Sequence, residues 1–344
     1  MAEDRLDYRG SGVDVKAGEE AVDAIRALVK NTYNANVLSD LGSFGGLYRF
    51  DQNSHTDPIL VASTDGVGTK LRVAIMARRF DTIGQDLVNH CVNDILVQGA
   101  LPLFFLDYIG LGKLDADIVR QIISGMAKAC VENGCALIGG EMAEMPGIYQ
   151  SGDFDLVGTI VGVVEREHLL PGARIRKGDV LIGIPSSGLQ TNGYSLARRI
   201  VFERLGLGIH DHVAELSGSV ADLLLSVHQS YLPLLKPFLL DRRLHGLAHI
   251  TGGGIPGNLK RVVPDGLCAY VSYAEREMPP LFKWLQRSGD ISRETMLETF
   301  NLGIGMVAVV DPAFSSEFVE ATSSLVIGEV SEARVPGAKV SIID

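Results

Sequence analysis

Short glycine-rich turns that follow apolar, strand-like runs recur five times along this chain of 344 residues. They occupy residues 63–70, 138–147, 185–193, 251–258 and 303–305. A strand that runs into glycine and then into a helix is typical of α/β proteins, where such turns lie at one edge of a sheet and bind ligands. We therefore expect an α/β (α+β) fold whose glycine turns converge on one cleft.

Strand-like and helical runs alternate in both halves of the chain, and the stretch 221–241 reads as helical with a proline break. The segment 168–181 is rich in turn-forming residues and separates the two halves. Because the chain is longer than most single hydrophobic cores, we predict two mixed α/β domains. They comprise residues 1–168 and residues 169–344.

Composition excludes several classes of protein. The formal net charge of −11 leaves no broad basic surface for nucleic acid. No run of about 18 apolar residues is present, so a membrane span is not expected. The acidic start "MAEDRLDYRG" argues against a secretory signal, and the four cysteines form no CxxC pair. We therefore expect reduced cysteines and a cytoplasmic protein.

The turn "STDGVGTK" at residues 63–70 is the first candidate for ligand chemistry. It lacks the spacing of a Walker A loop, which needs four residues between its first glycine and Gly-Lys-Ser/Thr. Its backbone amides can still form an anion-binding concavity, with Lys70 as a positive charge and Asp65 facing a cation. The alternative is a plain glycine turn with a solvated aspartate.

Two further carboxylates accompany this turn. Asp94 interrupts an otherwise apolar run in "HCVNDILVQGA", and Glu141 closes the strand "ALIGG". A buried carboxylate without a partner is unfavourable, and Mg²⁺ with nucleotide phosphates prefers oxygen ligands. Asp65, Asp94 and Glu141 are therefore candidate magnesium ligands. The alternative for each is a helix cap or an arginine partner.

Two glycine turns of the second half are candidate ligand contacts. "PSSGLQTNGYSL" places Ser187 and Gly188 before a helix predicted to begin near Asn192, which suits a phosphate or a simple helix cap. "HITGGGIPGN" satisfies G-x-G-x-x-G, but no acidic residue follows at the spacing of a dinucleotide site. No serine-hydrolase or zinc-protease motif is present. His90 reads as a histidine satisfied by its neighbours.

Seven motifs in the same order carry a resemblance across residues 7 to 307. They are "DYRGSGVDVKAG", "STDGVGTKLR", "DLVNHCVNDILVQGA", "LIGGEMAEMPGIY", "SSGLQTNGYSLAR", "HITGGGIPGNLKRVVP" and "TFNLGIGMV". The sequence resembles the phosphoribosylformylglycinamidine cyclo-ligases, also called aminoimidazole ribonucleotide synthetases.

The resemblance implies an ATP- and Mg²⁺-dependent enzyme of purine biosynthesis. ATP would phosphorylate the formyl-amide oxygen of formylglycinamidine ribonucleotide, after which an amidine nitrogen attacks and phosphate leaves. It also implies a homodimer, with strands of the N-terminal domain forming a barrel across the interface. Neither nucleic acid nor membrane is an expected partner.

The resemblance also implies roles for individual residues. The implied catalytic positions are Lys70, Asp107 and Gln190. The implied ATP contacts are Asp65, Gly66, Gly68, Thr69, Lys70, Asn93, Gly139 and Gly140, and the implied metal ligands are Asp65, Asp94 and Glu141. The implied substrate contacts are Ser187, Gly188, Asn192, Gly193, Gly252, Gly253 and Asn258.

Two positions depart from the family pattern: Gln190 replaces a histidine and Met142 replaces a threonine. Glutamine cannot exchange a proton near neutral pH, so a histidine base at this position is missing. Three alternatives remain open: a kinase or synthetase of the same superfamily such as thiamine-monophosphate kinase or selenophosphate synthetase, a dehydrogenase built on "GGGIPG", and a binding protein without activity.

Overall fold

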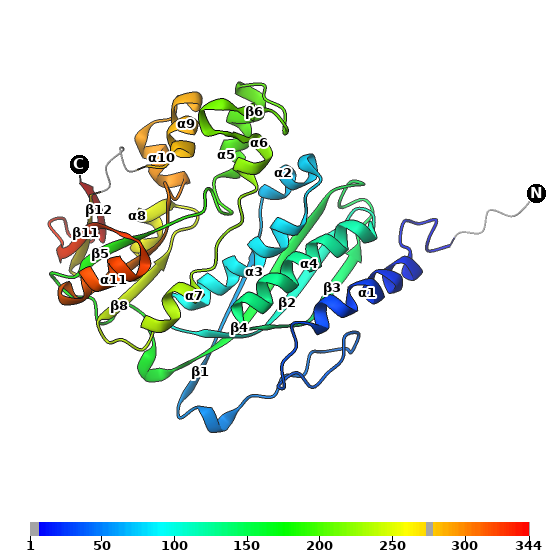
Figure 1. Ribbon diagram of the computed structural model, residues 1–344, viewed down its shortest axis with the longest axis horizontal. Helices are drawn as coiled ribbons and strands as arrows, with labels where there is room; N and C mark the ends of the chain where they lie inside the picture. The colour runs from blue at the N-terminus through cyan, green and yellow to red at the C-terminus, as the bar shows by residue number, and fades with distance from the viewer. Residues whose placement is uncertain (1–6, 273–277, 344) are drawn as a thin grey trace, which may run out of the picture.

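The computed structural model describes residues 7–272 and 278–343, and it contains two mixed α/β halves (Figure 1). Residues 1–6, part of the charged start that argues against a secretory signal, lie outside the described residues. The two main sheets use residues between 58 and 165 and between 180 and 343. The prediction of mixed α/β architecture in two halves is confirmed. The exact boundary after residue 168 stays a prediction.

The first half is a four-stranded sheet with helices on one face. Its strands are β1 (Pro58–Gly66), β2 (Leu101–Leu111), β3 (Ala136–Glu144) and β4 (Phe154–Glu165), in the order β1-β4-β2-β3. Its helices are α1 (Val15–Lys30), α2 (Lys70–Ala77), α3 (Asp81–Leu96) and α4 (Ala116–Asn133). Figure 1 shows α1, α4 and α3 side by side across the sheet.

Glycines allow α3 and α4 to pack closely. A Cβ atom on Gly84 of α3 would lie 2.1 Å from the carbonyl oxygen of Ile122, and one on Gly125 of α4 would lie 2.0 Å from that of Asp81. Both distances are far shorter than a van der Waals contact, so the backbones can approach this closely only without side chains. This close packing fixes the position of α3, which carries much of the candidate site.

The second half is built on a six-stranded sheet. Its strands are β5 (Val180–Pro185), β8 (Leu244–His249), β9 (Leu267–Ser272), β10 (Ile304–Val310), β11 (Leu325–Glu332) and β12 (Val340–Ile343), in the order β12-β9-β11-β5-β10-β8. Its helices are α5 (Tyr194–Arg198), α6 (Val220–Leu224), α7 (Leu232–Leu235), α8 (Gly254–Leu259), α9 (Pro280–Gly289), α10 (Arg293–Thr299) and α11 (Ser315–Thr322). Two short strands, β6 (His212–Val213) and β7 (Gly218–Ser219), pair separately.

The predicted helical stretch 221–241 differs from the structure. Residues 225–231 between α6 and α7 are not helical. Side chains of α3 hold their backbone instead, because His228 N donates to Asp86 Oδ1 at 2.7 Å and Tyr231 N donates to Asn93 Oδ1 at 2.9 Å. Contacts between the two halves therefore override the local helical preference.

Within residues 7–272 and 278–343, no helix covers the second face of the first sheet. Ser63 and Asp65 of β1 contact α3, so the alternate residue Leu60 points to the opposite face, where it is 63% exposed. The register places further partly exposed apolar side chains on that face, namely Phe104, Leu106, Tyr108, Val157 and Val161.

None of the helices in the described ranges is long and apolar enough to cross a membrane.

Candidate functional site

The turn 63–70 joins β1 to α2 and touches the second half of the molecule. Gly68 has a φ of 69°, which favours glycine, and Gly66 N donates to Asp65 Oδ1 at 2.7 Å. The hydroxyl of Thr69 lies 3.1 Å from that of Ser195 in α5. The turn is therefore a direct link between the two halves.

Lys70 does not face the open side of this turn. Its side chain is fully buried, and its Nζ lies 2.8 Å from Asp86 Oδ2 and donates to Ser226 O at 2.7 Å. Burial lowers the pKa of Lys70 and raises the pKa of Asp86, and the attraction between the two groups opposes both shifts. The phosphate contact of Lys70 stays a prediction, and in this structure its ammonium group ties the first half to the backbone of the second.

Three histidines meet where α3 packs against the second half. His90 comes from α3, His249 from the end of β8, and His228 from the segment between α6 and α7. Their ring centroids lie 5.1 to 5.2 Å apart, and all three side chains are buried. The prediction that His90 is satisfied by its neighbours is confirmed, because its two ring nitrogen atoms lie 2.8 Å from Thr191 Oγ1 and 3.0 Å from Asp65 Oδ2.

Two of the predicted carboxylates belong to the same cluster. Asp65 Oδ2 lies 3.0 Å from His90 Nε2, and Asp94 Oδ1 lies 2.9 Å from His249 Nδ1. Burial raises the pKa of Asp94, but its hydrogen bond and charge interaction with His249 outweigh burial, so the pKa falls below the usual range. Burial also lowers the pKa of His249. The cluster thus favours the charged form of Asp94.

Asp94 and His249 line a cavity of about 460 Å³ between the two halves. Ser63 contributes from β1, and Thr251 and Arg261 contribute from the segment that follows β8. This volume lies within the range of about 300–1,000 Å³ typical of ligand pockets. Arg261 is exposed and has no acidic partner among the described residues, so its guanidinium is free to bind an anion.

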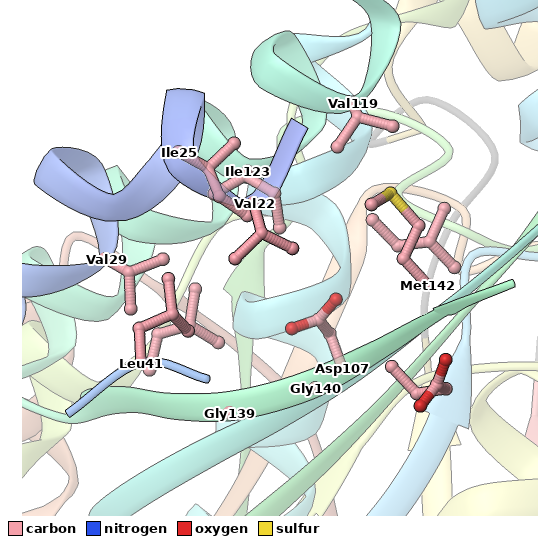
Figure 2. A pocket seen from close by; sticks show the side chains of 13 residues that line it. Val22, Ile25, Val29, Leu41, Asp107, Val119, Ile123, Gly139, Gly140 and Met142 are labelled. Carbon is pink, nitrogen blue, oxygen red and sulfur yellow. The ribbon is translucent and has the colours of Figure 1, made fainter. Parts of the chain in front are cut away.

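Asp107 lies in a different and smaller cavity, of about 70 Å³, between the sheet and helices α1 and α4 (Figure 2). Figure 2 shows its carboxylate pointing up among valine and isoleucine side chains of those helices. Burial raises the pKa of Asp107 to about 7. This cavity is well below the size of a ligand pocket, and the catalytic role of Asp107 stays a prediction.

Glu141 is separated from the other two predicted metal ligands. Asp65, Gly158, Asp107 and Gly140 form one row across β1, β4, β2 and β3, so Glu141 next to Gly140 lies three strands from Asp65. Neighbouring residues of a strand point to opposite faces, and strands are about 4.8 Å apart. Within one chain, a single ion cannot bind Asp65, Asp94 and Glu141 together.

Several predicted contacts have structural partners. Asn93 bonds the backbone of Gln229 and Tyr231, and Asn258 bonds three carbonyl groups of its own turn. Gln190 is buried with a φ of 60°, and its Nε2 donates to Tyr231 Oη at 3.0 Å. These three side chains support the turns around the site, and the buried Oε1 of Gln190 has no hydrogen-bond partner among the described residues.

Three of the five glycine turns contact one another in the second half, and the turn 63–70 contacts the adjacent helix α5. A Cβ atom on Gly252 would lie 3.4 Å from Asn192 Oδ1, and Ser186 N donates to Gly303 O at 2.8 Å. Ser187 and Gly188 line a second cavity, of about 550 Å³. Gly193 and Gly253 have φ values of 77° and 92° and support tight turns. The turn 138–147, with Gly139 and Gly140, lies apart beside Asp107.

Sequence reasoning missed His228, His249 and Arg261. His249 begins the motif "HITGGGIPGN" and Arg261 follows it closely, so their position after a strand was an available signal. Nothing in the sequence marks His228, because its partners lie in α3, far along the chain.

Both halves of the chain match known families. Residues 43–164 match the AIR synthase related protein N-terminal domain, and residues 176–341 match the corresponding C-terminal domain. Among curated proteins, the phosphoribosylformylglycinamidine cyclo-ligase of Geobacter sulfurreducens is 48% identical over 97% of both chains. The protein of the same name from Alkaliphilus metalliredigens is 44% identical over 96% of both chains.

Solved structures share the fold at low sequence identity. A hydrogenase maturation protein HypE in complex with ATP has a TM-score of 0.66 at 18% identity and covers 97% of this chain and 93% of its own. A thiamine-monophosphate kinase from Stenotrophomonas maltophilia K279a has a TM-score of 0.65 at 17% identity, covering 93% of this chain and 95% of its own. These similarities concern the fold alone.

Proposed function

The chain belongs to the family of phosphoribosylformylglycinamidine cyclo-ligases, and from this membership we propose that it closes the imidazole ring of 5-aminoimidazole ribonucleotide in purine biosynthesis. It is an ATP-dependent ligase. The observation that carries the proposal is 44–48% identity to relatives of this name over nearly the full chain. That breadth favours the cyclo-ligase over the kinase and dehydrogenase alternatives.

The reaction we propose has two steps. The γ-phosphoryl group of ATP passes to the formyl-amide oxygen of formylglycinamidine ribonucleotide, which leaves ADP. An amidine nitrogen then forms a bond to the activated carbon, and the carbon–oxygen bond breaks to release phosphate. The protein supplies orientation and charge stabilisation for both steps.

We place the ribonucleotide in the cavity between the halves. Arg261 gives this cavity an unpaired cation, which suits the 5′-phosphate of the substrate. Ser63 and Thr251 add hydroxyl groups for the sugar or the amide. Asp94 and His249 also line this cavity, so they are the groups available for proton transfer to or from the proposed substrate.

We place the ATP phosphates at the turn 63–70. Its amides lead into α2, and Gly66, Gly68 and Thr69 leave the outer side of the turn open. Mg²⁺ would accompany the phosphates, and Asp65, whose side chain is 46% exposed, is the carboxylate placed to meet it. Asp94 is turned toward the histidines and Glu141 lies across the sheet, so neither joins this proposed ion within one chain.

We also propose a homodimer formed through the helix-free face of the first sheet. That face presents Leu60, Phe104 and Val161 without a covering helix, and association would remove them from water. Two such sheets facing each other are compatible with the barrel expected for the family.

The four cysteines are unpaired and buried, which suits the reducing cytoplasm that we propose as the location.

The test is a paired assay of purified protein with Mg²⁺, ATP and formylglycinamidine ribonucleotide. ADP and aminoimidazole ribonucleotide are measured separately, the second by diazo coupling of its amine. We expect equal amounts of both products, and neither in the Asp65→Ala variant. ADP without the imidazole would show that activation occurs while ring closure fails. The absence of both products would contradict the cyclo-ligase assignment.

A further inference from the structure

The backbone of His228 is held by two polar side chains of α3. Its amide nitrogen donates to Asp86 Oδ1 at 2.7 Å, and its carbonyl oxygen accepts from Asn89 Nδ2 at 2.8 Å. Asp86 and Asn89 are themselves buried. Backbone groups that leave a helical pattern inside a protein need other partners, and α3 supplies them here. These two bonds fix the irregular segment between α6 and α7, and with it the position from which the His228 side chain starts.

The ring of His228 is held as firmly as its backbone. The side chain is fully buried, with Nδ1 at 3.2 Å from Thr191 Oγ1 and Nε2 at 3.2 Å from Asn93 Nδ2. The amide group of Asn93 cannot turn, because its Oδ1 accepts from Tyr231 N and its Nδ2 donates to Gln229 O. Contacts at both nitrogen atoms therefore leave the His228 ring a single orientation.

In this orientation the His228 ring faces His249. The two Nε2 atoms lie 3.1 Å apart, and the ring centroids lie 5.1 Å apart. One hydrogen atom between these nitrogen atoms makes a hydrogen bond, and either ring can supply it. The opposite nitrogen of His249, Nδ1, lies 2.9 Å from Asp94 Oδ1. His249 is thus held at both of its ring nitrogen atoms.

The second contact on the His249 ring has a mechanical purpose. A single hydrogen bond to Asp94 would let the ring swing about that contact, and His249 is the last residue of β8, so the strand supports it from one side only. A contact at the far nitrogen fixes the plane of the ring. Groups that transfer protons need such support, because a displacement of about 1 Å can cost about 100-fold in rate.

Gln190, at the position where the family pattern has a histidine, is directed elsewhere. Its Nε2 donates to Tyr231 Oη at 3.0 Å, and Tyr231 Oη in turn donates to Pro185 O at 3.0 Å. The imidazole in contact with His249 comes instead from the segment between α6 and α7.

We propose that His228 is a positioning residue, which holds the imidazole of His249 against Asp94 at the wall of the cavity between the two halves. The inference rests on the proposed function, in which Asp94 and His249 are available for proton transfer. His249 lines the cavity, whereas His228 is fully buried beside it. Loss of His228 should therefore slow turnover and leave substrate binding nearly unchanged.

The experiment measures steady-state kinetics of the full chain with Mg²⁺, ATP and formylglycinamidine ribonucleotide, together with thermal unfolding. His228→Phe keeps a planar ring and removes both nitrogen atoms. We expect its kcat to fall by about 10–100-fold, with the KM for the ribonucleotide little changed. His228→Gln keeps polar atoms that can bond His249 Nε2, so it should recover most of the lost kcat.

His245→Gln is the matched control, because His245 is a buried histidine near the other end of β8. It pairs with Asp179 at 2.7 Å, away from the cavity. This variant should lose stability without losing kcat. A raised KM with unchanged kcat in His228→Phe, an equal loss of kcat in His228→Phe and His228→Gln, or an equal loss in His245→Gln would overturn the proposal.

A second measurement separates this inference from the proposed function. NMR of the full chain with isotope-labelled histidine, without ATP or substrate, should show an imidazole N–H proton that is protected from exchange. Because this proton lies between the two rings, its signal should be missing in both His228→Phe and His249→Phe. The absence of the signal in the parent chain, or its persistence in His228→Phe, would overturn the proposal. A parent chain that forms no product would refute the proposed function, and the N–H signal would then decide this inference alone.

Discussion

Replacement of Lys70 by methionine distinguishes two roles for this residue. If Lys70 contacts ATP phosphates, Lys70→Met should raise the KM for ATP and leave stability nearly unchanged. In the structure, however, the ammonium group is fully buried 2.8 Å from Asp86. The variant should therefore lose stability first, because it leaves a buried carboxylate without its cation.

The expected loss follows from this geometry. Two unit charges 2.8 Å apart attract by about 6 kcal/mol at an effective dielectric constant of about 20. The net loss is smaller, because Asp86 Oδ1 keeps the hydrogen bond from His228 N and the carboxyl group can take up a proton. Removing one partner of a buried pair typically costs about 3–5 kcal/mol, and we expect a loss in that range for Lys70→Met.

Proton uptake by Asp86 also gives the loss a pH dependence. Without Lys70, the folded-state pKa of Asp86 lies above its unfolded value, since burial already raises it in the parent chain. The folded state then binds the proton more tightly, so stability falls as pH rises through the interval between the two pKa values. Lys70→Met should accordingly be less destabilised at pH 5 than at pH 8.

The assay is urea unfolding with linear extrapolation at both pH values. Lys70→Met/Asp86→Asn removes the orphan charge and should recover about 1 kcal/mol or more relative to Lys70→Met. Lys128→Met, on the exposed face of α4, is the matched control and should change stability by less than about 0.5 kcal/mol. Unchanged stability of Lys70→Met together with a raised KM for ATP would refute the structural role.

Three other predictions concern separate parts of the molecule. Asp107→Asn should gain stability relative to the parent chain as pH rises from 5 to 8. Burial raises the folded-state pKa of Asp107 to about 7, so the parent chain loses stability as pH rises through this range, whereas the variant does not. Urea unfolding across this range measures the difference in stability between the two chains, and a difference that does not change with pH would contradict the prediction. Arg261→Ala should raise the KM for the ribonucleotide by about 10–100-fold with kcat little changed, because one charged hydrogen bond is lost. Replacement of the exposed Arg287 by alanine is the control and should not raise this KM. An equal effect of both substitutions on steady-state kinetics would remove Arg261 from the phosphate site. Leu60→Asp on the helix-free sheet face should give monomers in sedimentation equilibrium, and Val131→Asp on the exposed face of α4 should not; a parent chain that is already monomeric would contradict the proposed dimer.

Local patterns in the sequence predicted the main elements of the fold. Helix α4 ends at Asn133 and is capped by Gly134, whose φ of 70° explains why a glycine stops the helical pattern there. The turn at Gly68 and the strand before it were predicted in the same way. These features depend on neighbours within a few residues, so one sequence contains the information. The stretch 225–231 was predicted as helical because its competing partners lie in α3, outside any local window.

The composition of the candidate site was only partly predictable. Asp65 and Asp94 were predicted as metal ligands and do lie in one cluster, while Glu141 was grouped with them although it lies three strands away. A strand pattern gives the alternation of faces but not the order of strands in the sheet. The order β1-β4-β2-β3 therefore decided which carboxylates are neighbours.

The sequence by itself determined the class of fold, the positions of the glycine turns and the family, because these depend on local chemistry and on motifs that can be read in order. The tertiary structure decided what each polar side chain contacts. Lys70 pairs with Asp86 and His228 meets His249 only because α3 packs against the second half of the chain. Such contacts arise from docking residues far apart in sequence, and burial then sets the charges they carry.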